Sequence, residues 1–121
     1  MSGFLTLINA NELFRFSADS LVYVSSDGNY SEIVTRDGAK RTVTVQLGVI
    51  EDLLNRQLRS KDDEFMRIGK SLIVNLNFVH YINPAKKQIV LSDSHTFSHS
   101  LEASKEALKQ LKDFFENNVK K

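Results

Sequence analysis

The chain has 121 residues, 41% hydrophobic and 26% charged, which is the composition of an ordinary soluble globular domain. It contains no cysteine, which excludes disulfides and thiolate metal sites. Sixteen Lys and Arg against fifteen Asp and Glu give a formal net charge of +1. That balance argues against a strongly cationic protein that coats nucleic acid, but it permits a local basic face. Residues 1–64 carry a net −3 and residues 65–121 a net +4, so we expect such a face in the second half.

The first residues give no sign of export or membrane insertion. Residues 1–8 lack a basic leader, and no apolar run approaches the roughly 18 residues that a membrane helix needs. No repeat, linker or low-complexity tract divides the chain. We therefore expect one cytoplasmic domain over residues 1–121, without a membrane contact.

Short β-rich runs separated by turn residues fill the first 45 residues. They predict strands at 5–8, 13–16, 21–24, 30–35 and 41–45, with turns at 25–28 and 37–38. Asp37-Gly38 between two such runs favours a hairpin, because glycine accepts the positive φ that tight turns require.

The hydrophobic period changes after Gln46. Leu47, Ile50, Leu54 and Leu58 fall at helical spacing and predict a helix that ends before the charged run 61–64, which we interpret as a solvated loop. Residues 65–76 are an apolar mix of ambiguous type. Further strands are predicted at 78–82, 88–91 and 96–99, with turns at 83–87 and 92–95.

The last stretch has the clearest helical pattern. Ser100 is the predicted N-cap, Glu102 lies in the predicted first turn, and Leu101, Leu108, Leu111 and Phe115 form an apolar stripe. The residues alone therefore predict a mainly β (α+β) domain, built of antiparallel strands with two helices.

Catalytic and metal-binding patterns are weak. No glycine-rich phosphate loop is present, and no acid, base and oxyanion donor assemble. His95 and His99 flank Phe97 in a predicted strand without an evident third ligand, and the carboxylates 62–64 are most simply a solvated run. We expect no enzyme activity, metal, cofactor or small-molecule substrate.

One stretch carries a family resemblance. In Phe65-Met-Arg-Ile-Gly-Lys-Ser-Leu-Ile-Val-Asn-Leu-Asn-Phe-Val, ten positions match the signature of LytTR-type DNA-binding domains, the output domains of response regulators. The matching residues are Phe65, Arg67, Ile68, Lys70, Ser71, Ile73, Val74, Asn75, Leu76 and Val79. Upstream, residues 21–24 and 27–30 resemble a second family motif. The resemblance extends over nearly the whole chain from about Phe14.

The resemblance implies an elongated fold of small antiparallel sheets, with a short helix between strands and a helix at the end. It also implies that loops at one edge enter successive major grooves of double-stranded DNA. The family pattern carries three segments over: Asn29 with Tyr30, Gly69 to Ser71, and Ser100 to Glu102. Two cations near these segments, Arg67 and Lys105, are added to them. The candidate DNA-binding residues are therefore Asn29, Tyr30, Arg67, Gly69, Lys70, Ser71, Ser100, Glu102 and Lys105.

Each candidate also has a structural interpretation. Lys70 is predicted to donate to a phosphate or to guanine, whereas Arg67 either neutralises a phosphate or pins a carboxylate. Tyr30 either meets DNA or packs at the start of a strand. Ser71 and Asn75 are predicted to brace a short turn at 72–75, because Ser and Asn side chains satisfy free backbone groups.

Two departures from the family pattern leave two functions open. Gly69 stands where the family has His, and Leu101 or Glu102 stands where the family has a base-reading Arg. A carboxylate repels phosphates, although it also accepts a hydrogen bond from cytosine; His99 or Lys105 is a candidate for compensation. The leading hypothesis is a transcriptional regulator that binds promoter DNA sequence-specifically, as two copies on direct repeats. The alternative is a protein-interaction module that keeps the fold without reading DNA. We expect no receiver domain within residues 1–121, so the chain is either a stand-alone regulator or a domain excised from a longer protein.

Overall fold

The computed structural model describes residues 3–58 and 65–119. In chain order the elements are β1 (Phe4–Ile8), β2 (Leu13–Ser17), the 3-10 turn η1 (Ala18–Ser20), β3 (Leu21–Asp27), β4 (Tyr30–Thr35), β5 (Lys40–Val43), α1 (Leu47–Gln57), β6 (Phe65–Ile68), β7 (Leu72–Asn75), η2 (Leu76–Phe78), β8 (Val79–Asn83), β9 (Gln88–Ser92), β10 (Ser98–Glu102) and α2 (Lys105–Val119).

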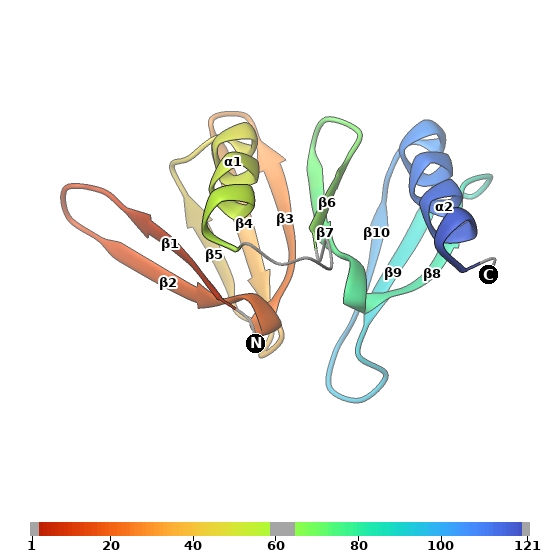
Figure 1. Ribbon diagram of the computed structural model, residues 1–121, viewed down its shortest axis with the longest axis horizontal. Helices are drawn as coiled ribbons and strands as arrows, with labels where there is room; N and C mark the ends of the chain where they lie inside the picture. The colour runs from red at the N-terminus through yellow and green to blue at the C-terminus, as the bar shows by residue number, and fades with distance from the viewer. Residues whose placement is uncertain (1–2, 59–64, 120–121) are drawn as a thin grey trace.

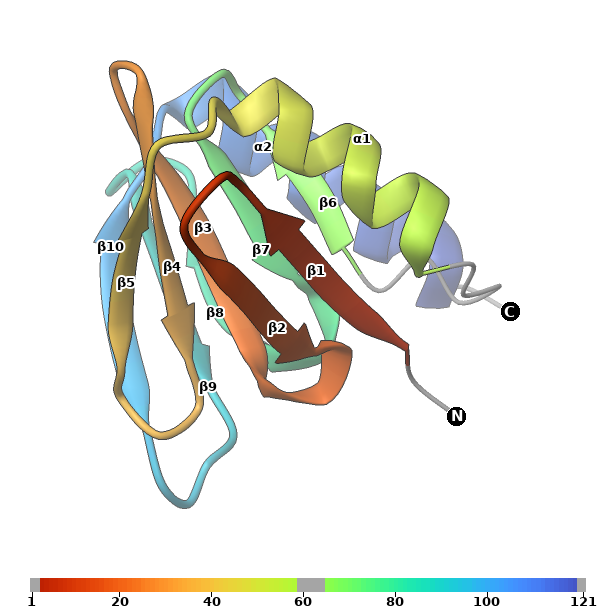
Figure 2. The ribbon, with the colours of Figure 1, turned by 90° about the vertical axis from the view of Figure 1, so that its left-hand side faces the viewer.

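The described strands form three antiparallel sheets. A five-stranded sheet, in the order β5-β4-β3-β7-β6, stands in the middle of the molecule. The β1–β2 hairpin and α1 cover one of its faces, and the three-stranded sheet β10-β9-β8 with α2 lies on the other side (Figures 1 and 2). Neither helix in the described part of the chain is long and apolar enough to cross a membrane.

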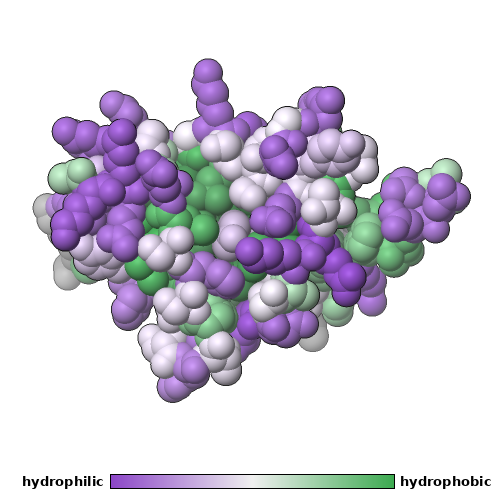
Figure 3. Space-filling model, turned by 180° about the vertical axis from the view of Figure 1, so that it is seen from behind, coloured by the Kyte–Doolittle hydropathy of each residue, from purple (hydrophilic) through white to green (hydrophobic). Residues whose placement is uncertain are grey.

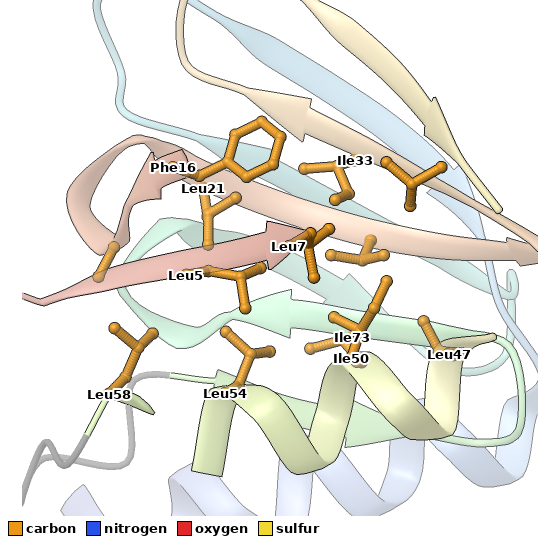
Figure 4. Packing of buried hydrophobic residues seen from close by; sticks show 13 residues of the cluster. Leu5, Leu7, Phe16, Leu21, Ile33, Leu47, Ile50, Leu54, Leu58 and Ile73 are labelled. Atoms are coloured by element: carbon orange, nitrogen blue, oxygen red, sulfur yellow. The ribbon is translucent and has the colours of Figure 1, made fainter. Parts of the chain in front are cut away.

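Two hydrophobic cores lie on opposite faces of the central sheet. Ile50 and Leu54 of α1 lie beside Leu5 of the hairpin and Ile73 of the sheet, in a cluster that extends to Ile33 of β4 (Figure 4). This packing places the start of α1 at one end of the sheet, in front of the β3–β4 turn in Figure 1.

The second core joins the central sheet to the C-terminal half. Leu108 and Leu111 of α2 are fully buried, in a cluster with Ile68 of β6 and Ile89 of β9. The cluster holds the three-stranded sheet, α2 and the β6–β7 hairpin in fixed positions relative to one another.

The fold confirms the predicted mainly β class and most element positions, including the helix after Gln46. The start of the last helix was predicted wrongly. Ser100, Leu101 and Glu102 belong to β10, where Leu101 pairs with Ile89. The helix begins at Lys105, and the Ser104 hydroxyl caps it by accepting the Ala107 N–H at 3.1 Å.

Two other predictions differ from the structure, and a third is not tested. The ambiguous stretch 65–76 forms the β6–β7 hairpin, so the expected turn at 72–75 is the strand β7, buried between β3 and β6. Strand β3 continues through Asp27, and the turn follows at Gly28 and Asn29. The charged run 61–64 lies outside the described residues.

Candidate nucleic-acid interface

Several turns and element ends meet along one edge of the molecule, at the top of Figure 1. The β3–β4 turn, the β6–β7 turn and the start of α2 all lie there. The β8–β9 turn joins them, because the Ala103 N–H donates to the Lys87 carbonyl at 3.1 Å. We call this surface the loop edge and define it by residues 27–30, 69–71, 84–87 and 102–105.

Hydrogen bonds fix the β3–β4 turn within the loop edge. The Ser26 N–H donates to the Ser71 carbonyl at 2.9 Å, which ties this hairpin to the β6–β7 hairpin. The Asn29 Oδ1 accepts from the Gln46 Nε2 at 3.2 Å, so part of its bonding capacity is used within the protein. Tyr30 is 49% exposed, and its ring is therefore accessible to a ligand.

The β6–β7 turn is held by glycine and by an arginine clamp. Gly69 has φ +59°, and a Cβ built there would lie 3.2 Å from the Ala107 Cβ, so the turn lies close against α2. Arg67 donates to the Lys70 carbonyl at 2.8 Å and to the Glu51 carboxylate at 3.2 Å. These contacts match the structural interpretation of Arg67, whereas Lys70 and Ser71 are exposed at the turn.

A groove of about 720 Å³ separates the β6–β7 turn from the end of β10. Its polar lining comes from Ser25, Ser26, Glu32, Lys70, Ser71, Glu102 and Ser104. Seen from behind, hydrophilic side chains project along the upper rim, with hydrophobic surface recessed between them (Figure 3). The structure thus brings Gly69, Lys70 and Ser71 together with Glu102.

The third predicted segment is a strand and not a loop. Ser100 lies two residues back from the end of β10, and its hydroxyl accepts from the Gln88 Nε2 at 3.0 Å. Glu102 is exposed at the strand's end. Lys105 is the first residue of α2, whereas the predicted N-cap at Ser100 would place it one turn into the helix.

Two cations at the loop edge were missed by sequence reasoning. Lys86 and Lys87 are exposed in the β8–β9 turn, next to the end of β10. The turn itself was predicted from the segment 83–87, but only the pairing of Gln88 with Glu102 reveals that it adjoins the candidate residues. Ser104 was also missed, although a serine three residues before a helical alanine is a recognisable cap.

The loop edge has mixed charge. Its exposed cations are Lys70, Lys86, Lys87 and Lys105, and its exposed anions are Asp27, Glu102 and the neighbouring Glu106. Lys70 and Lys105 form no ion pair within the described residues. The surface is therefore suited to a few phosphate contacts and not to a dense electrostatic grip.

Asn75 has the structural role that the sequence predicts. It is 1% exposed, donates to the Leu21 carbonyl at 2.7 Å and accepts the Asn77 N–H at 2.9 Å. These bonds fix the end of β7 against β3 and start the 3-10 turn, as expected for a buried amide whose polar groups need partners. Asn75 does not contribute to the exposed surface.

The histidines considered as metal ligands lie in different settings. The His99 ring contacts Tyr23 and Phe97, each at 5.6 Å between centroids, and its Nε2 is buried without a hydrogen-bond partner among the described residues. Burial, and then the charge of Lys40, lower the pKa of His99. His95 lies exposed after β9, and no group of three metal-binding side chains occurs in the described ranges 3–58 and 65–119.

Comparison with known proteins agrees with this architecture. The family model of the LytTr DNA-binding domain matches residues 11–116. A solved LytTr DNA-binding domain of a response regulator from Bacillus cereus is similar in fold, with a TM-score of 0.65 and 19% sequence identity over 93% of this chain and 96% of that chain. No curated protein matches. Because the family model spans most of the sequence, the chain belongs to the LytTr DNA-binding domain family, whose members are regulators of transcription.

Proposed function

We propose that the loop edge binds promoter DNA sequence-specifically and reads its major groove. The observation that carries the proposal is the gathering of Tyr30, Lys70 and Lys105, all exposed, on one edge of a DNA-binding fold. Turns project further from a domain than the strands they join, so they are suited to enter a groove. Lys86 and Lys87 extend the positive charge along the same edge.

The residues have distinct roles in this proposal. Lys70 contacts a phosphate or a guanine edge, Asn29 and Tyr30 donate to bases or backbone, and Gly69 with Ser71 shapes the turn that presents Lys70. Glu102 accepts from a base such as cytosine, with Lys105 beside it to offset its charge. Arg67 acts on the interface through the turn backbone. Two copies would occupy repeated sites on the promoter.

A fluorescence anisotropy titration tests the proposal. Labelled duplexes tile the promoter regions of the source genome, and binding is measured from about 50 to 200 mM salt. We expect one duplex to bind, with log K falling linearly as log salt rises. Lys70→Ala should weaken binding and reduce the slope by about 0.9, the loss of one phosphate contact.

The matched control is Lys112→Ala. Lys112 lies in the middle of α2, away from the loop edge, in an exposed ion pair with Glu116 at 3.6 Å. Its replacement should leave affinity and salt slope unchanged. Absence of binding to every promoter duplex at about 50 mM salt, by a folded protein, would contradict the proposal.

The exposed Glu102 favours one second candidate function, a module that binds another protein and has lost its DNA reader. Glu102→Arg distinguishes the two. If the scaffold is intact and only the reader is missing, this variant gains DNA affinity that the natural chain lacks. A natural chain that already binds DNA argues for the first function, and Glu102→Arg should then change the preferred base.

A further inference from the structure

Strand β2 has a free edge. The Thr6 N–H donates to the Gln57 Oε1 at 2.8 Å and its carbonyl accepts from the Gln57 Nε2 at 3.2 Å, so both backbone groups of Thr6 point away from β2. Arg15 is the partner of Thr6, and opposite residues of an antiparallel pair direct their backbone groups alike. The N–H and carbonyl of Arg15 therefore point away from β1, without a partner in the described residues.

A groove of about 700 Å³ runs beside this free edge. Its walls are β2 with the ring of Phe4, and the β4–β5 turn with the flanking residues Thr35 to Arg41. It lies at the opposite end of the central sheet from the loop edge, because the β3–β4 and β4–β5 turns are at opposite ends of β4 (Figure 2). An occupant of this groove would leave the loop edge accessible.

The groove combines apolar walls with positive charge. Phe14 and Phe16 are stacked on the side of the β1–β2 hairpin that faces the sheet. Phe4 of β1 and Leu13 of β2 are 42% and 61% exposed on the outer side of the hairpin. Arg15, Arg36 and Arg41 line the groove against a single carboxylate, Asp37.

Two of the three arginines are available to a partner. Arg36 is paired with Asp93 at 3.6 Å, whereas Arg15 and Arg41 form no ion pair within the described part of the chain. Arg41 interacts with the Asp37 carboxylate of the same groove electrostatically, at a distance longer than an ion pair. The Arg15 guanidinium lies 3.8 Å from the centre of the Phe4 ring, in a cation–π contact that leaves its donors exposed.

We propose that this groove binds an extended, acidic segment of a partner protein, which adds a strand to the free edge of β2. Backbone bonds to Arg15 supply the affinity, and alternate side chains supply the specificity. Acidic side chains of the segment face Arg15 and Arg41, and the intervening apolar side chains cover Phe14 and Phe16.

Charge decides between this occupant and a second copy of the chain. Two copies of β2 paired antiparallel about their centres would place Arg15 opposite Arg15, and like charges directly opposite are destabilising. An acidic segment instead places a carboxylate opposite Arg15, and opposite charges attract.

The probe for the test is a fluorescein-labelled ten-residue peptide in which valine or threonine alternates with glutamate. Its control carries lysine in place of glutamate. By anisotropy we expect the acidic peptide to bind with a Kd below about 1 mM, the range of weak transient contacts, and the basic peptide not to bind. Arg15→Glu should weaken binding at least about tenfold, and Lys109→Glu, the same charge change on exposed α2, should not.

Hydrogen exchange identifies the binding mode. Strand addition should protect the Arg15 amide at least about tenfold in the presence of the acidic peptide, since that N–H is free without it. Equal binding of both peptides, or an unprotected Arg15 amide, would overturn the inference. So would self-association in sedimentation that Arg15→Glu abolishes, which would identify a second copy as the occupant. Finally, a comparable loss of DNA affinity in Arg15→Glu would assign the groove to nucleic acid.

Discussion

The Arg67 guanidinium donates to the backbone carbonyl of Lys70 at 2.8 Å, across the turn that displays the Lys70 side chain. The same guanidinium pairs with Glu51 of α1 at 3.2 Å. Arg67, a cation of the family signature, thus bonds to groups of the protein itself. Its guanidinium holds the turn backbone from which the exposed Lys70 side chain projects. Arg67 is accordingly a positioning residue for the proposed interface.

Substitutions of Arg67 distinguish a role in positioning the turn from a direct contact with a DNA phosphate. Arg67→Lys keeps the charge but loses the planar fork that reaches Glu51 and the Lys70 carbonyl together. We expect Arg67→Lys and Arg67→Gln to weaken DNA binding by similar factors, and each to lower the free energy of unfolding by about 1 kcal/mol. Titrations with labelled duplex and urea denaturation measure both effects. If Arg67→Lys bound DNA like the natural chain while Arg67→Gln did not, the phosphate role would be correct.

Gly69 supports the same turn through its backbone. Gly69→Ala meets both a positive φ of +59° and the Ala107 Cβ at 3.2 Å, so we expect it to destabilise the fold by about 1–2 kcal/mol and to weaken DNA binding. Gly38→Ala is the matched control, because Gly38 has φ +86° with nothing within 4 Å. The excess cost of Gly69→Ala in urea denaturation measures the contact with α2. Equal costs, with unchanged DNA binding, would show that this contact does not hold the turn.

Periodicity located most of the fold because burial on one face leaves a local pattern. The helix after Gln46 was predicted from the spacing of Leu47, Ile50 and Leu54, and all three are buried in α1. Leu101 was misassigned since it lies seven residues before Leu108, two helical turns, while its actual partner is Ile89 across a sheet. Pairing between distant strands leaves no such spacing in the sequence.

The candidate site also depends on contacts between residues far apart in the sequence, which no local pattern records. The family pattern located Lys70 in an exposed turn, and that part of the prediction needed only local sequence. Lys86 and Lys87 join the loop edge through the pairing of β9 with β10, which no motif records. The inward direction of Arg67 depends on Glu51, sixteen residues earlier on α1. Which cation faces out is therefore set by tertiary packing.

Loss of the Asn75 amide should be costly. Asn75→Ala removes two hydrogen bonds that a buried side chain makes, to the Leu21 carbonyl and from the Asn77 N–H, and we expect a loss of about 2 kcal/mol in the free energy of unfolding. Asn55→Ala, at an exposed position of α1, should change it by less than about 0.5 kcal/mol. Urea denaturation at neutral pH gives both values. A cost of Asn75→Ala no larger than that of the control would mean that the two bonds contribute little.

The pKa of His99 predicts how stability changes with pH. Burial first, and then the charge of Lys40, lower this pKa in the folded chain, so the unfolded chain takes up the proton at a higher pH than the folded chain does. The contribution is fully present above the unfolded value of about 6.5 and is lost as pH falls toward the lowered folded pKa. We expect denaturation midpoints in urea to decrease between pH 7 and pH 5. His99→Phe should flatten that decrease without a cost at pH 7, because the Nε2 has no partner to lose and the ring site between Tyr23 and Phe97 is retained. His80→Gln, at an exposed position of β8, should keep the decrease. If His99→Phe retained the full decrease from pH 7 to pH 5, its source would lie in another group.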